Sequence, residues 1–181
     1  MREINSSNSK SNPKQFLSSI AVMATSAVIF LFFASTTTLP PTASIQQAYR
    51  EALKTENQIN KLILLSKPHV SNPLAKAYLA TGYALEARAS WSPATKMSKA
   101  QEAYSLLNQA VKAEPNNEEI RFLRLSFSHG TPDFLNMKSY MADDKKIFLQ
   151  GEIKKHPISD IMWSFINHSN LFSAAEKATI K

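Results

Sequence analysis

The chain has 181 residues, a formal net charge of +7 and no cysteine. Without cysteine it has no disulfide, no catalytic thiolate, no cysteine metal ligand and no lipid-modified cysteine. Glycine is scarce, with 3 residues, and the frequent alanine, leucine, glutamine and lysine residues have a low free-energy cost in helices, so we expect an all-α protein.

The positive charges are dispersed along the sequence. The longest basic runs are pairs such as Lys145-Lys146 and Lys154-Lys155. A nucleic-acid-binding protein more often has a dense basic stripe with interleaved aromatic residues or glycines. We therefore interpret the charges as solvated helix faces and expect no nucleic-acid partner, with an anionic partner surface as the alternative.

The N-terminal region contains a long uncharged stretch. No charged side chain occurs in residues 15–49, and residues 16–34 include nothing more polar than serine and threonine. A helix over residues 16–34 would rise about 28 Å, close to the roughly 30 Å hydrocarbon thickness of a bilayer. It would also satisfy its own backbone hydrogen bonds in lipid. Arg2, Lys10 and Lys14 precede it, so the positive-inside rule predicts a cytoplasmic N-terminus and export of the rest.

A cleaved secretory signal is the alternative to an uncleaved anchor. Signal peptides have apolar cores of about 7 to 15 residues and a small-x-small cleavage site. The apolar block here is longer, Phe32 occupies one of the small positions before Ala34, and Thr42-Ala43-Ser44 offers only a weak site. A buried core helix, the third interpretation, is disfavoured by polar and proline-rich flanks.

The sequence thus predicts four segments. Residues 1–14 form a cytoplasmic tail, residues 15–38 a transmembrane anchor or signal segment, residues 39–43 a spacer, and residues 44–181 an exported helical domain. The domain is either held at the cell membrane through residues 16–38, on the periplasmic or extracellular side, or secreted after cleavage.

The exported domain begins with a predicted helix that starts at a capping box of Ser44 and Gln47. Pro68 ends this helix. Its apolar residues recur at spacings of three, four and seven and so share one face: Ile45, Tyr49, Ala52, Ile59, Leu62 and Ile63.

The next helix is predicted to begin at Asn72, a capping residue, with Pro73 in the first helical position. Large residues form one stripe along it, and small residues allow a neighbouring helix to approach closely. The large residues are Leu74, Tyr78, Thr81 and Leu85, and the small ones are Ala77, Ala80, Ala84 and Ala87.

A third helix is predicted over residues 99–114. Its residues Ala103, Leu107, Ala110 and Pro115 follow the small, large, small, proline order that the second helix of a tetratricopeptide hairpin uses. Small residues admit the partner helix, the large one fills the space between them, and proline ends the unit.

The two helices together resemble a tetratricopeptide hairpin in part. Tyr78 and Gly82 correspond to the aromatic residue and the glycine of the first helix, but roughly nine extra residues separate the two halves. No second full copy occurs in the sequence. The predicted fold class is all-α, an N-terminal membrane helix followed by a tetratricopeptide-like antiparallel helical array.

Residues 113–125 predict a turn between two packed helices. Pro115 ends one helix, Asn116 or Asn117 caps the next, and two glutamates then suit the positive end of the helix dipole. The apolar residues that follow at helical spacing predict a buried face: Ile120, Leu123 and Phe127, flanked by Phe122 and Leu125.

Arg121 and Arg124 are the candidate partner-binding residues. They lie three apart, on the same side of the predicted helix. One interpretation is structural: the arginines cap carbonyl groups or pair with acids such as Glu118. The other is a bidentate clamp for a carboxylate or phosphate of a partner, which guanidinium geometry permits.

Gly130 and Pro132 are expected to end this helix. Phe134 and Leu135 are expected to fill a gap beneath the loop that follows. A fifth helix is predicted over about residues 142–155, with acids in its first turn and lysines in its last, an order that suits the helix dipole.

The first turn of this fifth helix contains Asp143 and Asp144. Paired aspartates can bind a metal or act as acid and base, but adjacent residues on a helix point about 100° apart, so we expect no such site. Ser159 is expected to begin a short helix, and Ser173 with Glu176 predicts a capping box for the terminal helix.

No catalytic constellation stands out in the sequence. The histidines have no H-E-x-x-H spacing, and no glycine-flanked nucleophilic serine or phosphate loop occurs. We therefore expect no cofactor and no catalytic or metal site. The four histidines are His69, His129, His156 and His168.

The segments NNEEIRFLRL and TPDFL, followed by the aspartate-bearing helix, resemble a family of bacterial envelope proteins with a tetratricopeptide-like helical domain. The resemblance covers residues 72–146 and includes an alanine-rich helix, a Pro-x-x-Lys loop (Pro93 and Lys96) and a Pro-Asn-Asn turn. It implies an exported helical domain and brings no established activity. The chain departs from the family in its long polar N-terminal extension and weak cleavage site.

The sequence therefore favours a membrane-tethered, exported helical interaction module that binds a protein or peptide partner in the cell envelope. Helical hairpins expose faces that recognise such partners. An envelope enzyme, either a hydrolase or a metal-dependent one, and a purely structural spacer are the alternatives.

Overall fold

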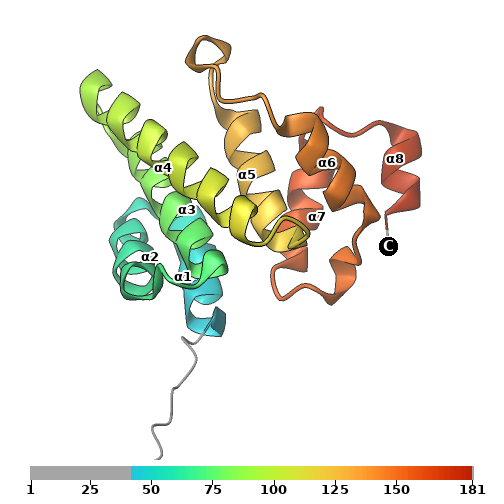
Figure 1. The fold of residues 1–181 in the computed structure, drawn as a ribbon, viewed down its shortest axis with the longest axis horizontal. Helices are drawn as coiled ribbons and strands as arrows, with labels where there is room; N and C mark the ends of the chain where they lie inside the picture. The colour runs from blue at the N-terminus through green and yellow to red at the C-terminus, as the bar shows by residue number, and fades with distance from the viewer. Residues whose placement is uncertain (1–41, 181) are drawn as a thin grey trace, which may run out of the picture. The chain divides into compact units, whose positions relative to one another are not determined.

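The computed structural model describes residues 42–180 (Figure 1). The predicted cytoplasmic tail and the predicted membrane segment lie outside the described residues. Within the described residues, no helix is both long and apolar enough to cross a bilayer.

The described residues form helices and turns, with no strand among them, which confirms the predicted all-α class. In Figure 1, α1 to α4 lie on one side of α5, and α6 to α8 lie on the other. The helices are α1 (Thr42–Lys54), α2 (Ile59–Ser66), α3 (Pro73–Ala89), α4 (Pro93–Ala113), α5 (Glu118–Gly130), α6 (Met141–Gln150), α7 (Ser159–His168) and α8 (Ala174–Thr179).

The first predicted helix is in fact two helices, so the prediction of one helix up to Pro68 was wrong. The chain leaves the helical conformation at Thr55, whose φ is −145° and ψ is 128°. A 3₁₀ turn, Glu56–Gln58, then leads into α2. The break folds α2 back onto α1, and both helices contact α3. Ile45 of α1 and Leu62 of α2 are thereby both buried, which one straight helix would not achieve.

A long hairpin of α3 and α4 is the largest packing unit of the fold (Figure 1). Asn72 caps α3 as predicted, because its side chain accepts a hydrogen bond from Ala75 N at 3.0 Å. α4 begins at Pro93, earlier than the predicted residue 99, because Ser92 caps it. The close contact depends on small residues with no exposed surface: Ala77, Ala80, Ala103 and Ala110.

α5 packs against α3, α4 and α6. Asn117 is its cap, as one of the two predicted possibilities, and its side chain accepts hydrogen bonds from Glu119 N and Ile120 N at 3.1 Å each. The predicted apolar face is confirmed, with Phe127 half-buried at its edge. Its fully buried members are Ile120, Phe122, Leu123 and Leu125.

Two predictions in the C-terminal part were wrong. Phe134 does not fill a gap beneath the loop, because 76% of its surface is exposed, whereas Leu135 is half-buried against Ala87, Ala100 and Met137. α6 ends at Gln150, not near residue 155, and has no basic residue in its last turn. The lysines predicted there lie in the 3₁₀ turn Ile153–Lys155 that follows.

The other two predictions for this part are confirmed. α7 begins at Ser159, and Ser173 with Glu176 forms a capping box for α8. A cluster of phenylalanine rings holds these C-terminal helices on α5, with centroids 5.5 to 6.1 Å apart. Its members are Phe122, Phe148, Phe165 and Phe172.

Candidate functional site

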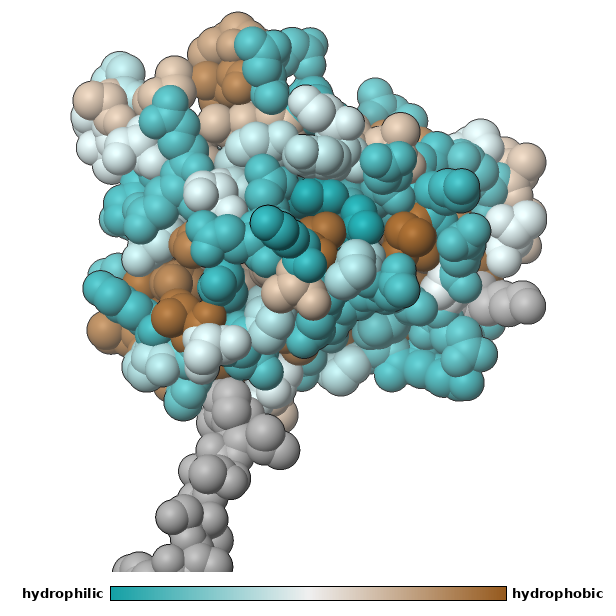
Figure 2. Space-filling view, viewed as in Figure 1, coloured by the Kyte–Doolittle hydropathy of each residue, from teal (hydrophilic) through white to brown (hydrophobic). Residues whose placement is uncertain are grey.

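A wide apolar groove of about 1120 Å³ is the candidate binding site. We call it the helical groove. It is lined by the C-terminal part of α1, the last turns of α3, the first turns of α4, α5, α7 and the loop of residues 131–135. This loop stands at the top of Figure 1, and Figure 2 shows apolar surface over it.

Three large apolar side chains of the groove lining are exposed to solvent. Leu53 of α1 is 38% exposed, Met97 of α4 is 38% exposed, and Phe134 of the loop is 76% exposed. Single exposed apolar residues are common on proteins, but their convergence on one concave surface is typical of a binding site.

Local features of the chain place these residues in the groove. Because Ser92 caps α4, the helix begins six residues earlier than predicted, and this added stretch, residues 93–98, contains Lys96 and Met97. The loop after Gly130 is tied back by Thr131, whose hydroxyl donates to Phe127 O at 2.7 Å. It returns through Asn136, whose φ of 53° is left-handed, a conformation that asparagine tolerates better than most residues.

The charged groups of the lining are mostly positive. Arg88 and Lys96 are exposed, and neither side chain has an ion pair or hydrogen bond among residues 42–180. Asp160 is the one carboxylate that the described lining contains. It binds Arg50 of α1, and the hydrogen bond from Arg50 lowers the pKa of Asp160 despite opposing desolvation.

Two of the four histidines line the groove. The His129 ring packs edge-on against Phe165, with centroids 5.6 Å apart. His168 lies at the end of α7, with Nδ1 2.7 Å from Ser164 O. No hydrogen bond or ion pair joins either histidine to Asp160, the carboxylate of the described lining.

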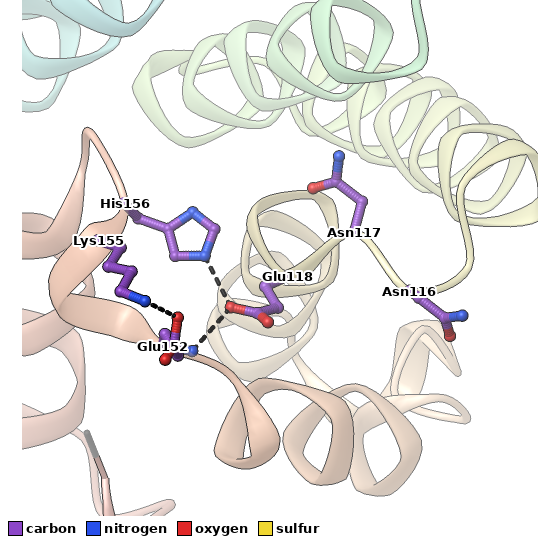
Figure 3. A pocket seen from close by; sticks show the side chains of 6 residues that line it. All are labelled: Asn116, Asn117, Glu118, Glu152, Lys155 and His156. Atoms are coloured by element: carbon purple, nitrogen blue, oxygen red, sulfur yellow. Dashed lines mark hydrogen bonds and ion pairs between the residues drawn. The ribbon is translucent and has the colours of Figure 1, made fainter.

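A second, smaller pocket of about 340 Å³ lies at the start of α5 (Figure 3). The Glu118 carboxylate is its centre: Glu118 Oε2 lies 2.7 Å from His156 Nε2 and accepts a hydrogen bond from Glu152 N at 3.2 Å. Figure 3 shows the Glu118 and His156 side chains pointing toward each other, with Lys155 paired to Glu152 beside them. This arrangement joins α5 to the turn after α6.

His156 also lies beside a buried carboxylate. Its Nδ1 is 3.7 Å from Glu119 Oε2. The carboxylate of Glu119, and then that of Glu118, raise the pKa of His156 above its ordinary value, although partial burial opposes them. The two carboxylates thus favour the imidazolium form of His156 relative to a free histidine.

Glu119 links three helices at the centre of the fold. Its Oε1 accepts a hydrogen bond from Gln46 Nε2 at 2.8 Å and another from the Tyr78 hydroxyl. Burial alone would raise the pKa of Glu119, but hydrogen bonds from His156, Tyr78 and Gln46 outweigh burial and lower it. Burial and the adjacent Glu119 raise the pKa of Tyr78. The tyrosine hydroxyl therefore stays protonated and donates a hydrogen bond to Glu119.

Arg121 and Arg124, the predicted partner-binding residues, are occupied within the chain. Both bind Asp144, which is fully buried. Arg121 Nε also donates to Pro115 O at 2.7 Å, and Arg124 Nη1 donates to Asn108 Oδ1 at 2.9 Å. A bidentate carboxylate clamp exists here, as guanidinium geometry permits, and the carboxylate belongs to α6. The arrangement matches the structural interpretation, with Asp144 in place of Glu118.

Within the described residues, no group of three or more histidine, aspartate or glutamate side chains is placed to hold a metal ion. Of the predicted aspartate pair, Asp143 is exposed and Asp144 is buried against the two arginines.

The sequence did not predict the groove residues. The sequence predicts that Phe134 fills a gap beneath the loop, and it places Met97 before the third helix, which is predicted to begin at residue 99. The early capping residue Ser92 and the following Pro93, a favoured pair for a helix start, are the signal that locates α4 correctly. Comparison of the chain with protein-family models, curated proteins and solved structures finds no match.

Proposed function

We propose that this protein is a helical interaction module that binds a segment of a partner protein in the helical groove. The observation that carries the proposal is the convergence of exposed apolar side chains on one groove. Its volume of about 1120 Å³ exceeds the roughly 300–1,000 Å³ typical of small-molecule pockets. A groove of this size and apolar character suits an amphipathic helix laid along it.

The cellular location of the module is part of the same proposal. Residues 16–38 would hold it at the membrane, with the helical domain on the periplasmic or extracellular side, or the domain would be released after cleavage. The absence of charge in residues 15–49 and the preceding cations support this orientation. A reporter that is active only outside the cytoplasm, fused to the C-terminus, should be active; a silent reporter that is nonetheless produced would reverse the orientation.

The finer fold prediction, a tetratricopeptide-like antiparallel array, and the resemblance to the envelope family also belong to the proposal. In support, Ala103, Leu107 and Ala110 of α4 are fully buried against α3. On the α3 side, Gly82 is buried where α2 approaches. Concave faces of such arrays recognise peptides.

Site-specific photo-crosslinking in cells that produce the full chain tests the binding role. Benzoylphenylalanine replaces Met97 or Phe134 in the groove, or Leu64 as the control. Leu64 is 70% exposed on α2 and does not line the groove. The proposal expects the same partner segment, mapped by mass spectrometry, from both groove positions and not from Leu64.

The mapped segment is then synthesised and titrated against the purified chain. Specific binding that a charged substitution at Met97 removes supports the proposal. Equal crosslinking from Leu64 and the groove positions, or no binding by the synthetic segment, would count decisively against it. Such a result would favour the structural spacer, and an enzymatic activity in the purified chain would favour the alternative of an envelope enzyme.

A further inference from the structure

We infer that the helical groove selects a partner segment that carries carboxylates next to its apolar residues, and that Arg88 and Lys96 bind these carboxylates. This inference rests on the proposed function and specifies the chemistry of the partner. It depends on where the two cations lie, on what neutralises them, and on which occupants the charges disfavour.

Arg88 and Lys96 lie on facing helices at the turn end of the α3–α4 hairpin. Arg88 is in the last turn of α3, and Lys96 is near the start of α4. The Lys99–Glu86 ion pair, with Nζ and Oε2 3.3 Å apart, joins the two helices at this end. Both cations line the groove and are exposed.

No carboxylate among the described residues neutralises these cations. Neither side chain has an ion pair or hydrogen bond there. The nearby acids are already engaged: Glu86 and Glu102 both bind Lys99, and Asp160 binds Arg50. An anion bound in the groove would therefore gain favourable Coulomb energy from both unpaired cations.

The start of α4 adds to this positive potential. α4 has 21 residues, its N-terminus lies at the same end of the hairpin, and its first turn contains no acid. The positive end of a helix dipole stabilises nearby anions. The apolar lining begins directly beside these charges, with Met97 and Ala100 on the same helix. A matching ligand therefore has acidic side chains next to apolar ones.

Charge complementarity also distinguishes between occupants. The chain's own segment before α1, residues 15–41, has no charged side chain and would leave both cations unpaired. A second copy of the chain has a net charge of +7 and is repelled on average. An acidic amphipathic segment of a partner protein satisfies both the apolar lining and the cations.

The test is a selection from a display library of random peptides, with the full chain held in uncharged phosphatidylcholine nanodiscs. Peptides of about 16 residues would extend roughly 24 Å as helices. Selected peptides are then resynthesised with every Asp and Glu replaced by Asn and Gln. Binding is measured for the wild type, for the double variant R88Q/K96Q, and for the matched control K67Q/K112Q. Lys67 and Lys112 are exposed and lie outside the groove lining, so both double variants lose the same charge.

The inference expects selected peptides enriched in Asp and Glu. Their affinity should fall about tenfold in R88Q/K96Q and on amide replacement, and also as salt is raised, since exposed charge pairs are screened. The control K67Q/K112Q should bind as the wild type does. Unfolding of each variant, followed by circular dichroism, separates lost binding from lost folding, because Arg88 also complements the negative end of the α3 dipole.

Two outcomes would overturn the inference in distinguishable ways. Peptide binding that Met97→Glu removes but that shows no acid preference and no change in R88Q/K96Q overturns the inference and leaves the proposed function intact. If no selected peptide binds in a way that Met97→Glu weakens, both the inference and the proposed function are overturned. Palmitate serves as the lipid probe. If palmitate binds in the groove and no peptide does, the two cations bind a lipid carboxylate, and the proposal of a protein partner is contradicted.

Discussion

Arg124 holds the buried carboxylate of Asp144 through two parallel hydrogen bonds, from Nε and Nη2, each 2.7 Å long. Asp144 is fully buried and Arg124 is only 4% exposed, so the pair is removed from water. Arg121 donates a third bond to the same carboxylate, also at 2.7 Å. This contact joins α6 to α5.

Replacing Asp144 with Asn should therefore destabilise the protein strongly. The substitution leaves two guanidinium groups without their counter-charge, and breaking a buried pair from one side typically costs about 3–5 kcal/mol. Urea unfolding measures the free energy of unfolding. Asp143→Asn, at the exposed neighbouring position, is the control and should change it by no more than about 0.5 kcal/mol. Equal effects of the two substitutions would show that the pair contributes nothing to stability.

The stability of the fold should decrease as pH rises from 6 to 9. The pKa of His156 is raised in the folded state by Glu119 and Glu118. The contribution of His156 is thus fully present below its unfolded pKa of about 6.5 and is lost as the pH rises through the folded pKa. The pKa of Glu119 is lowered in the folded state, so the stabilisation that its ionised form contributes is present at neutral pH. This stabilisation is lost only at acidic pH, as the pH falls through that pKa.

The measurement is the urea midpoint at a series of pH values. His156→Gln should flatten the decline between pH 6 and 9. His69→Gln, which changes a histidine far from these carboxylates in sequence and in a different turn, should leave the decline as in the wild type. A decline that persists in His156→Gln would assign it to another group.

Two glycine-to-alanine substitutions should change stability in opposite directions. At Gly82 a Cβ would lie 2.7 Å from Ile63 Cγ1, whereas at Gly130 it would meet nothing within 4 Å. Overpacking at Gly82 costs about 1–3 kcal/mol, of which the better helix propensity of alanine offsets roughly 1 kcal/mol. Gly130→Ala should instead stabilise by about 0.4–1 kcal/mol through the unfolded state. Thermal unfolding compares the two variants, and a stabilised Gly82→Ala would show that α2 moves freely against α3.

Several helix starts were predictable because a cap is a local feature, but the predicted capping box of Ser44 and Gln47 was wrong, since α1 already begins at Thr42. Asn72 with Pro73, Asn117, and Ser173 with Glu176 each act within about three residues of the amide groups they satisfy, and each is found where the sequence placed it. The break at Thr55 was not predictable in this way. It has no proline or glycine, and it exists because α1 and α2 both pack on α3.

The candidate site was less predictable, because it depends on contacts between distant residues. The groove lining brings together Leu53 of α1, Met97 of α4 and Phe134 of the loop after α5, which are far apart in the sequence. Periodicity predicts which residues share an apolar helix face, but it does not show whether another part of the chain covers that face. Phe134 illustrates this: the sequence favoured burial, and the fold leaves the ring exposed on the groove.

The most direct test of the groove as a binding site is titration calorimetry of the full chain with the crosslinked partner segment at several temperatures. Burial of apolar surface should give a negative heat-capacity change. Met97→Glu should weaken binding by at least about tenfold, since it replaces an apolar contact with the ligand by a carboxylate, whereas Leu64→Glu should leave the affinity unchanged. Binding that Met97→Glu leaves intact, or that Leu64→Glu weakens equally, would contradict the assignment of the groove.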